Sequence, residues 1–162
     1  MGLPIDKRMP LEIETAKKMT IEQVLQETGK YVGPTVGVSM LPMLKNRRDS
    51  IIVSKKAERL KPLDVALYKR GGDYVLHRVL QLVDGAYIIR GDNCYSDEYI
   101  LEDQVIGVLT EFYRKDKHYF CTDKKYLRYA KRRVANYPIR RIVFKIKSMI
   151  YAIARRVLKG KK

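Results

Sequence analysis

The sequence is poor in the residues that build metal and disulfide sites. Its 162 residues include only two cysteines and two histidines. Cys94 and Cys121 lack the spacing of zinc ligands, and one possible pair is not a disulfide framework. His118 follows a lysine-rich stretch without ligand-type neighbours, and no glycine-rich phosphate loop is present. We therefore expect neither a metal nor a cofactor.

Long apolar runs are also missing. Residues 1–19 contain no apolar stretch that could form a signal-peptide core or a membrane span. Thr20 and Gln23 form a capping-box pattern before a short apolar face, and Gly29 can end the helix. We expect residues 1–30 to be an N-terminal segment whose short amphipathic helix packs under a sheet.

Acidic residues are absent from residues 124–162, although the whole chain has a net charge of +16. This stretch is broken at Pro138, so an earlier helical piece is expected around residues 124–135. Apolar residues then recur at helical spacing, without a charge-free run long enough to span a bilayer. The recurring residues are Ile139, Ile142, Val143, Ile146, Met149, Ile150, Ile153 and Val157.

We interpret residues 116–162 as a basic amphipathic helical tail. Such a helix typically lies in the interface of an anionic membrane, which is the partner that we favour for residues 139–159. Docking to a partner protein or to the domain's own surface, and binding to nucleic acid, are alternatives. The last is disfavoured because no nucleic-acid motif is present and the apolar stripe is broader than phosphate binding needs.

Residues 31–115 have the pattern of a β-rich domain. Residues 49–54, 65–69, 74–83, 86–93 and 105–114 form short runs rich in β-branched and large apolar residues, separated by tight turns. Residues 31–35 read as a loop. This pattern predicts a mainly β fold with an antiparallel sheet core.

The pair Asp84-Gly85 predicts a two-residue hairpin turn, which would place Val83 opposite Ala86. In that register His77 faces Asp92 directly, and opposed residues have Cβ atoms about 4.5–5.5 Å apart. A carboxylate beside an imidazole is the pair that orients a catalytic base. A surface ion pair, or a bulge near Gly91 that shifts the register, is the alternative.

The stretch Gly37–Leu44 places Ser39 between a glycine and Met40, with Pro42 three residues on. A serine nucleophile needs a base within hydrogen-bond reach and N–H groups for an oxyanion. An ordinary turn has similar composition, so the case for a nucleophile depends on His77. Cys94 lies near the same site in sequence but does not match the nucleophile pattern.

Three segments together resemble a known family. Gly37–Leu44 is similar to the nucleophile box of type I signal peptidases, Gly-x-Ser-Met-x-Pro-x-Leu. Leu76–Val79 is similar to their general-base box, and Arg90–Asn93 to their Gly-Asp-Asn box. The resemblance covers residues 33–110 and is to the Ser–His variety, since His77 stands where many bacterial members have lysine.

The resemblance implies a signal peptidase/LexA-like fold with Ser39 as nucleophile and His77 as general base. Backbone N–H groups of Ser39 and Met40 would hold the oxyanion. In the Ser–His variety a second aspartate follows the Gly-Asp-Asn box, and Asp97 lies at that place, so Asp92 and Asp97 are competing candidates for the orienting carboxylate.

The chain also departs from this family. Arg48 precedes Asp49 where the family has Gly-Asp, and no transmembrane helix precedes the nucleophile. We expect the basic tail to replace that anchor, giving a peripheral membrane protein. Its charge favours the cytoplasmic face, whereas signal peptidases cut on the outer side, so the side remains open.

The predicted function is a serine endopeptidase that cleaves leader or signal segments with small residues just before the cut. One alternative is a catalytically silent module that binds a peptide or scaffolds a partner on a membrane surface. Another is a LexA-like self-processing protein, although the lysine base and separate DNA-binding domain of that group are not evident. Nothing in the sequence indicates the oligomeric state.

Overall fold

The computed structural model describes residues 19–159, so the predicted segment 1–30 is described only from residue 19 and most of it lies outside the described residues. The elements, in chain order, are α1 (Ile21–Thr28), β1 (Lys30–Pro34), β2 (Ser50–Lys55), β3 (Val65–Arg70), β4 (Asp73–Val83), β5 (Ala86–Arg90), β6 (Glu98–Leu101), a 3-10 turn (Glu102–Gln104), β7 (Val105–Arg114), β8 (Lys117–Phe120), α2 (Lys124–Ala135) and α3 (Tyr137–Lys159).

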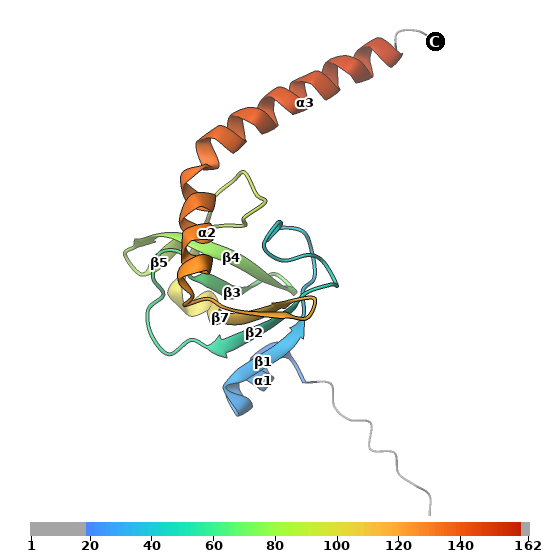
Figure 1. The fold of residues 1–162 in the computed structure, drawn as a ribbon. Helices are drawn as coiled ribbons and strands as arrows, with labels where there is room; N and C mark the ends of the chain where they lie inside the picture. Colours follow the sequence, from blue (N-terminus) through green and yellow to red (C-terminus); the bar gives the residue numbers. More distant parts are fainter. Residues whose placement is uncertain (1–18, 160–162) are drawn as a thin grey trace, which may run out of the picture.

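The strands form one antiparallel sheet in the order β1-β2-β7-β3-β4-β5-β6, with β8 also pairing with β7. The predicted mainly β fold, with a short N-terminal helix and a helical C-terminal tail, is confirmed (Figure 1). Three strands were not predicted, namely β1, β6 and β8. β1 contains Gly33 and Pro34, which read as loop residues; as an edge strand it tolerates proline.

Helix α1 forms as the sequence predicts. The Thr20 hydroxyl accepts from the Gln23 N–H at 3.2 Å, and the Gln23 side chain accepts from the Thr20 N–H at 2.8 Å. Gly29 ends the helix with a φ of 74°, a conformation that favours glycine. Leu25 is buried in the core, so the helix packs on the sheet as expected.

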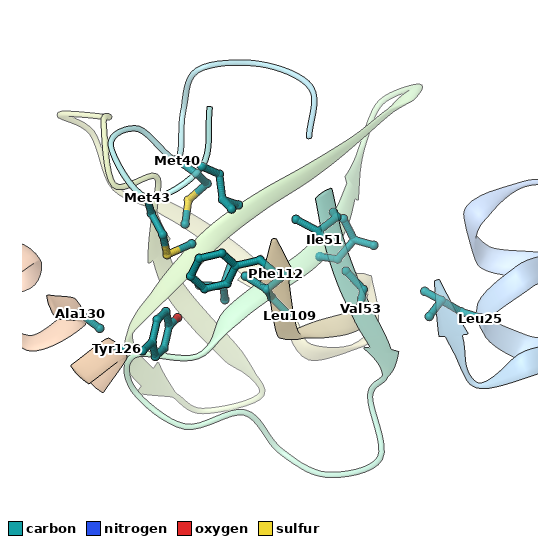
Figure 2. Packing of buried hydrophobic residues seen from close by; sticks show 12 residues of the cluster. Leu25, Met40, Met43, Ile51, Val53, Leu109, Phe112, Tyr126 and Ala130 are labelled. Atoms are coloured by element: carbon teal, nitrogen blue, oxygen red, sulfur yellow. The ribbon is translucent and has the colours of Figure 1, made fainter. Parts of the chain in front are cut away.

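The core lies on both faces of β3, where alternate residues belong to different hydrophobic clusters. Val65 and Leu67 join one cluster, and Ala66 and Tyr68 join the other. Figure 2 shows the first cluster, which includes Met40 and Met43 from the turn that carries Ser39, together with Phe112, Tyr126 and Ala130. Burial of these methionines fixes the turn on the sheet, because returning an apolar side chain to water raises the free energy.

The tail consists of two helices that behave differently. α2 lies against the sheet and buries Tyr126 and Ala130, whereas α3 extends away from the domain at the end opposite α1 (Figure 1). The expected earlier helix around residues 124–135 is α2, while β8 lies inside the range 116–162 predicted as tail. No helix among residues 19–159 has the length and apolar character needed to cross a membrane.

Candidate active site

Ser39 lies half-buried in the long connection between β1 and β2. Asp49 closes this connection: its carbonyl accepts from the Thr35 N–H at 2.8 Å, and its carboxylate accepts from the Lys45 N–H at 2.8 Å. Arg48 stands where the signal peptidases that the sequence resembles have a glycine, and it forms an ion pair with Asp49 at 2.6 Å. Burial would raise the pKa of Asp49, but the hydrogen bonds from Arg48 and Lys45 outweigh it and lower the pKa. The contacts of Asp49 therefore hold the β1–β2 connection in shape with arginine instead of glycine at position 48.

The Gly-Asp-Asn segment touches the serine turn directly. The Asn93 N–H donates to the Ser39 carbonyl at 2.7 Å. The N–H groups of Ser39 and Met40 donate no hydrogen bond to any other residue within the described part of the chain. These two donors are the ones expected to bind an oxyanion, and no acceptor among the described residues occupies them.

His77 is in β4 and is only 2% exposed. Its Nδ1 lies 3.2 Å from the Tyr68 hydroxyl and 3.2 Å from Glu98 Oε1. The Tyr68 hydroxyl donates its proton to Glu98 Oε2 at 2.7 Å, so its oxygen must accept from His77. This network favours the tautomer with the proton on Nδ1, which leaves Nε2 free to act as a base.

The other side of the His77 ring faces Gly91. A Cβ atom on Gly91 would lie 2.9 Å from His77 Nε2, 2.8 Å from the Ser39 carbonyl oxygen and 2.7 Å from Cys94 Sγ. Only glycine fits here, because the serine turn, the imidazole and Cys94 pack closely around this position. Cys94 Sγ lies 3.9 Å from Nε2, whereas the Ser39 hydroxyl makes no hydrogen bond to His77 in the described structure.

The predicted pairing of His77 with Asp92 is wrong. The expected register holds from Val83 to Gln81, but a bulge between Gln81 and Val79 shifts it by one residue, so that Arg78 pairs with Arg90. One extra residue in β4 carries His77 out of line with Asp92. Asp92 instead forms a buried bidentate ion pair with Arg78, with both N–O distances at 2.8 Å.

Asp97 does not contact the imidazole either: in this structure it is bound to Arg90, so its predicted orienting role has no support from the geometry. Its carboxylate is 50% exposed and binds Arg90 at 2.7 Å. The carboxylate beside His77 is Glu98, the next residue along the chain. Sequence reasoning missed Glu98 because β6 was not predicted, so no register placed residue 98 beside His77.

The surroundings of His77 keep the ring neutral. Burial lowers the pKa of His77, while the Glu98 carboxylate raises it and Arg70 lowers it, and the net direction is down. Burial raises the pKa of Glu98, but the hydrogen bond from Tyr68 and the charge and hydrogen bond of Arg70 lower it, and the net direction is below its ordinary value. A neutral imidazole next to an ionised carboxylate is the resting state of a general base.

Asp92 joins several elements of the fold and does not pair with His77. Besides Arg78, its carboxylate accepts from the Tyr129 hydroxyl of α2 at 3.0 Å. Arg78 also donates to the Tyr126 hydroxyl at 3.0 Å and to the Leu63 carbonyl at 2.8 Å. The pair therefore joins β4, the Gly-Asp-Asn segment and α2.

Asp92→Asn is expected to lower the free energy of unfolding by about 3–5 kcal/mol, because it leaves the Arg78 charge buried without its counter-ion. The side chains of Arg78 and Asp92 are only 1% and 2% exposed. Thermal unfolding should show a fall in Tm on the order of 10 °C. Asp97→Asn is the matched control and should change stability by less than about 1 kcal/mol, because the Asp97 side chain is 50% exposed and its ion pair is screened by water. Equal Tm values for the two variants would contradict this assignment.

No protein-family model and no curated protein matches this chain. Within residues 19–159, His, Cys, Asp and Glu side chains form no group that could hold a metal ion.

Proposed function

We propose that the protein is a serine endopeptidase in which Ser39 is the nucleophile, His77 the general base and Glu98 the carboxylate that orients the base. The observation that carries this proposal is the position of His77. Glu98 and Tyr68 hold Nδ1, and Nε2 faces Gly91, against which the Ser39 turn packs closely. Catalytic hydrogen bonds are often long before substrate binds, so the missing bond between Ser39 and His77 is compatible with this role.

In the proposed reaction, Nε2 of His77 takes the hydroxyl proton of Ser39 as the oxygen attacks the peptide carbonyl. The carbonyl oxygen becomes an oxyanion, which the N–H groups of Ser39 and Met40 stabilise. Collapse breaks the C–N bond, and the imidazolium gives its proton to the leaving amine. Water then hydrolyses the acyl-enzyme with His77 again acting as base.

The surface beside Ser39 suits a short apolar segment in an extended conformation. Val36 and Val38 precede the serine and are exposed by 79% and 57%. Substrate side chains laid along this stretch would cover both valines, a gain of apolar burial. The resemblance to signal peptidases adds the expectation of a leader or signal segment with small residues just before the cut.

The experiment that tests the proposal is incubation of the full chain with a panel of leader-type peptides that differ in the residues before one candidate cut, with products mapped by mass spectrometry. We expect one cut site, which is lost when the small residues are replaced by large ones. A peptide that binds but is never cut would instead favour the silent binding module. Cleavage of the chain itself in place of added peptide would favour the self-processing alternative.

The pH profile of cleavage provides an independent prediction. Because burial lowers the pKa of His77 below its ordinary value of 6.5, the neutral base persists into mildly acidic solution. We expect kcat/KM to be close to its maximum at pH 7 and to fall along an acidic limb whose midpoint is below 6.5. A midpoint above 6.5 would mean that the charge of Glu98 outweighs burial, contrary to our assignment.

A further inference from the structure

Helix α3 leaves a broad apolar face without a partner. Its apolar residues recur every three or four positions and are largely exposed, with values between 45% for Val143 and 65% for Ile139. The face is formed by Ile139, Ile142, Val143, Ile146, Met149, Ile150 and Ile153. Isolated exposed apolar residues are ordinary, but a continuous stripe along a helix marks an interaction surface.

The contacts that join α3 to the domain lie at its first two turns and on another side of the helix. Phe144 stacks on Tyr95 with ring centroids 4.1 Å apart, and Arg140 donates to the Asp92 carbonyl at 2.6 Å. At 100° per residue, Arg140 and Phe144 lie far round the helix from the centre of the stripe at Ile146 and Ile150. The stripe therefore points away from the domain, as the extended position of α3 in Figure 1 allows.

A strongly basic hollow lies where α2 meets α3. Its volume is about 670 Å³, and its basic lining consists of Lys125, Arg128, Arg132, Arg133 and Arg140. None of these five side chains forms an ion pair with a carboxylate within residues 19–159. Ile139, at one end of the apolar stripe, also lines the hollow. Like charges that surround one space without a carboxylate partner favour an anion in that space.

We propose that this surface docks the protein on an anionic phospholipid membrane, with the stripe of α3 in the interface and a phosphate-bearing headgroup in the hollow. Charge complementarity between the basic hollow and an anionic membrane favours the membrane as the partner. A second copy would bring two helices without acidic residues together, and like charges repel. The phosphates of a nucleic acid could bind in the basic hollow, but the apolar stripe of α3 would then remain exposed to water.

Docking in this way would place the candidate active site close to the membrane. Arg133 of α2 donates to the Leu41 carbonyl at 3.2 Å and to the Asp92 carbonyl at 2.6 Å. The Tyr137 hydroxyl donates to the Tyr95 carbonyl at 2.6 Å. The junction of α2 and α3 is thus bound to the loops around Ser39 and His77, so a membrane-bound α3 would fix the distance of the site from the lipid.

The test is sedimentation of the full chain with vesicles of phosphatidylcholine alone and of phosphatidylcholine with 30% phosphatidylglycerol. We expect binding at least tenfold tighter to the anionic vesicles. The double variant Ile146→Asn/Ile150→Asn should weaken that binding at least tenfold. Ser148→Asn is the matched control, because it introduces the same residue on the opposite side of the same exposed helix, and it should bind like the unmodified protein.

The hollow has its own variant, Arg128→Gln/Arg132→Gln, which should reduce the preference for anionic vesicles by about tenfold or more, since each basic residue near such a surface contributes measurably. Equal binding to both vesicle types, or unchanged binding of the Ile146/Ile150 variant, would overturn the proposal. So would tight binding to a 20-base-pair duplex with a steep salt slope, or a dimer that buries α3. Because vesicle binding is measured without any cleavage, failure of the docking proposal is distinguishable from failure of the peptidase proposal.

Discussion

Ser39→Ala is expected to abolish peptide cleavage, with a fall in kcat of about 10⁶-fold, the size of the loss when a serine peptidase loses its nucleophile. The variant removes one oxygen from a half-buried turn. Met40 and Met43 continue to anchor that turn in the core, so the fold should be unchanged. The measurement is the rate of product formation from the best peptide of the panel, with the Tm of the variant as a check on folding.

Cys94 is the competing nucleophile that this experiment must exclude. Its Sγ is 3.9 Å from His77 Nε2, and no residue of the serine turn makes a comparable side-chain contact with that nitrogen. Burial, however, raises the pKa of the Cys94 thiol, which reduces the thiolate that a cysteine nucleophile requires. Cys94→Ser should keep cleavage within about threefold of the original rate. Loss of cleavage in Cys94→Ser together with activity in Ser39→Ala would reverse the assignment.

The strands that sequence reasoning located are those whose pattern is local. β4, β5 and the turn at Asp84-Gly85 were predicted because runs of β-branched and large apolar residues and turn chemistry act over a few residues. The same is true of the capping box at Thr20. The Ser39 turn and His77 were likewise identified from short segments, and the structure brings those segments to one side of Gly91.

What could not be predicted depends on non-local register. The bulge between Val79 and Gln81 has no distinct sequence signal, yet one extra residue decides which carboxylate meets the imidazole. The role of Arg78 could not be predicted either, because a basic residue in a strand ordinarily points to solvent. Its burial depends on its contacts with Asp92 and with α2. Distant elements supply the partners that make these buried charges tolerable.

Glu98→Gln is expected to lower kcat by about 10²–10⁴-fold while leaving the fold intact. Glutamine keeps the acceptor for the Tyr68 hydroxyl but offers an N–H₂ group to His77 Nδ1, 3.2 Å away in the native arrangement. That donor favours the tautomer with the proton on Nε2, which cannot accept a proton from Ser39. Glu98→Gln thus tests positioning of the base by a change that removes charge but keeps size.

A second readout separates this role from a merely structural one. The Glu98 carboxylate raises the pKa of His77 against the effect of burial, so its neutralisation should move the acidic limb of kcat/KM to lower pH. Asp97→Asn is the matched control, since Asp97 is the neighbouring carboxylate and binds Arg90 rather than His77; it should leave both the rate and the limb within error. If Asp97→Asn shifts the limb and Glu98→Gln does not, then Asp97 orients the base when substrate is bound, and the arrangement around His77 must change on binding.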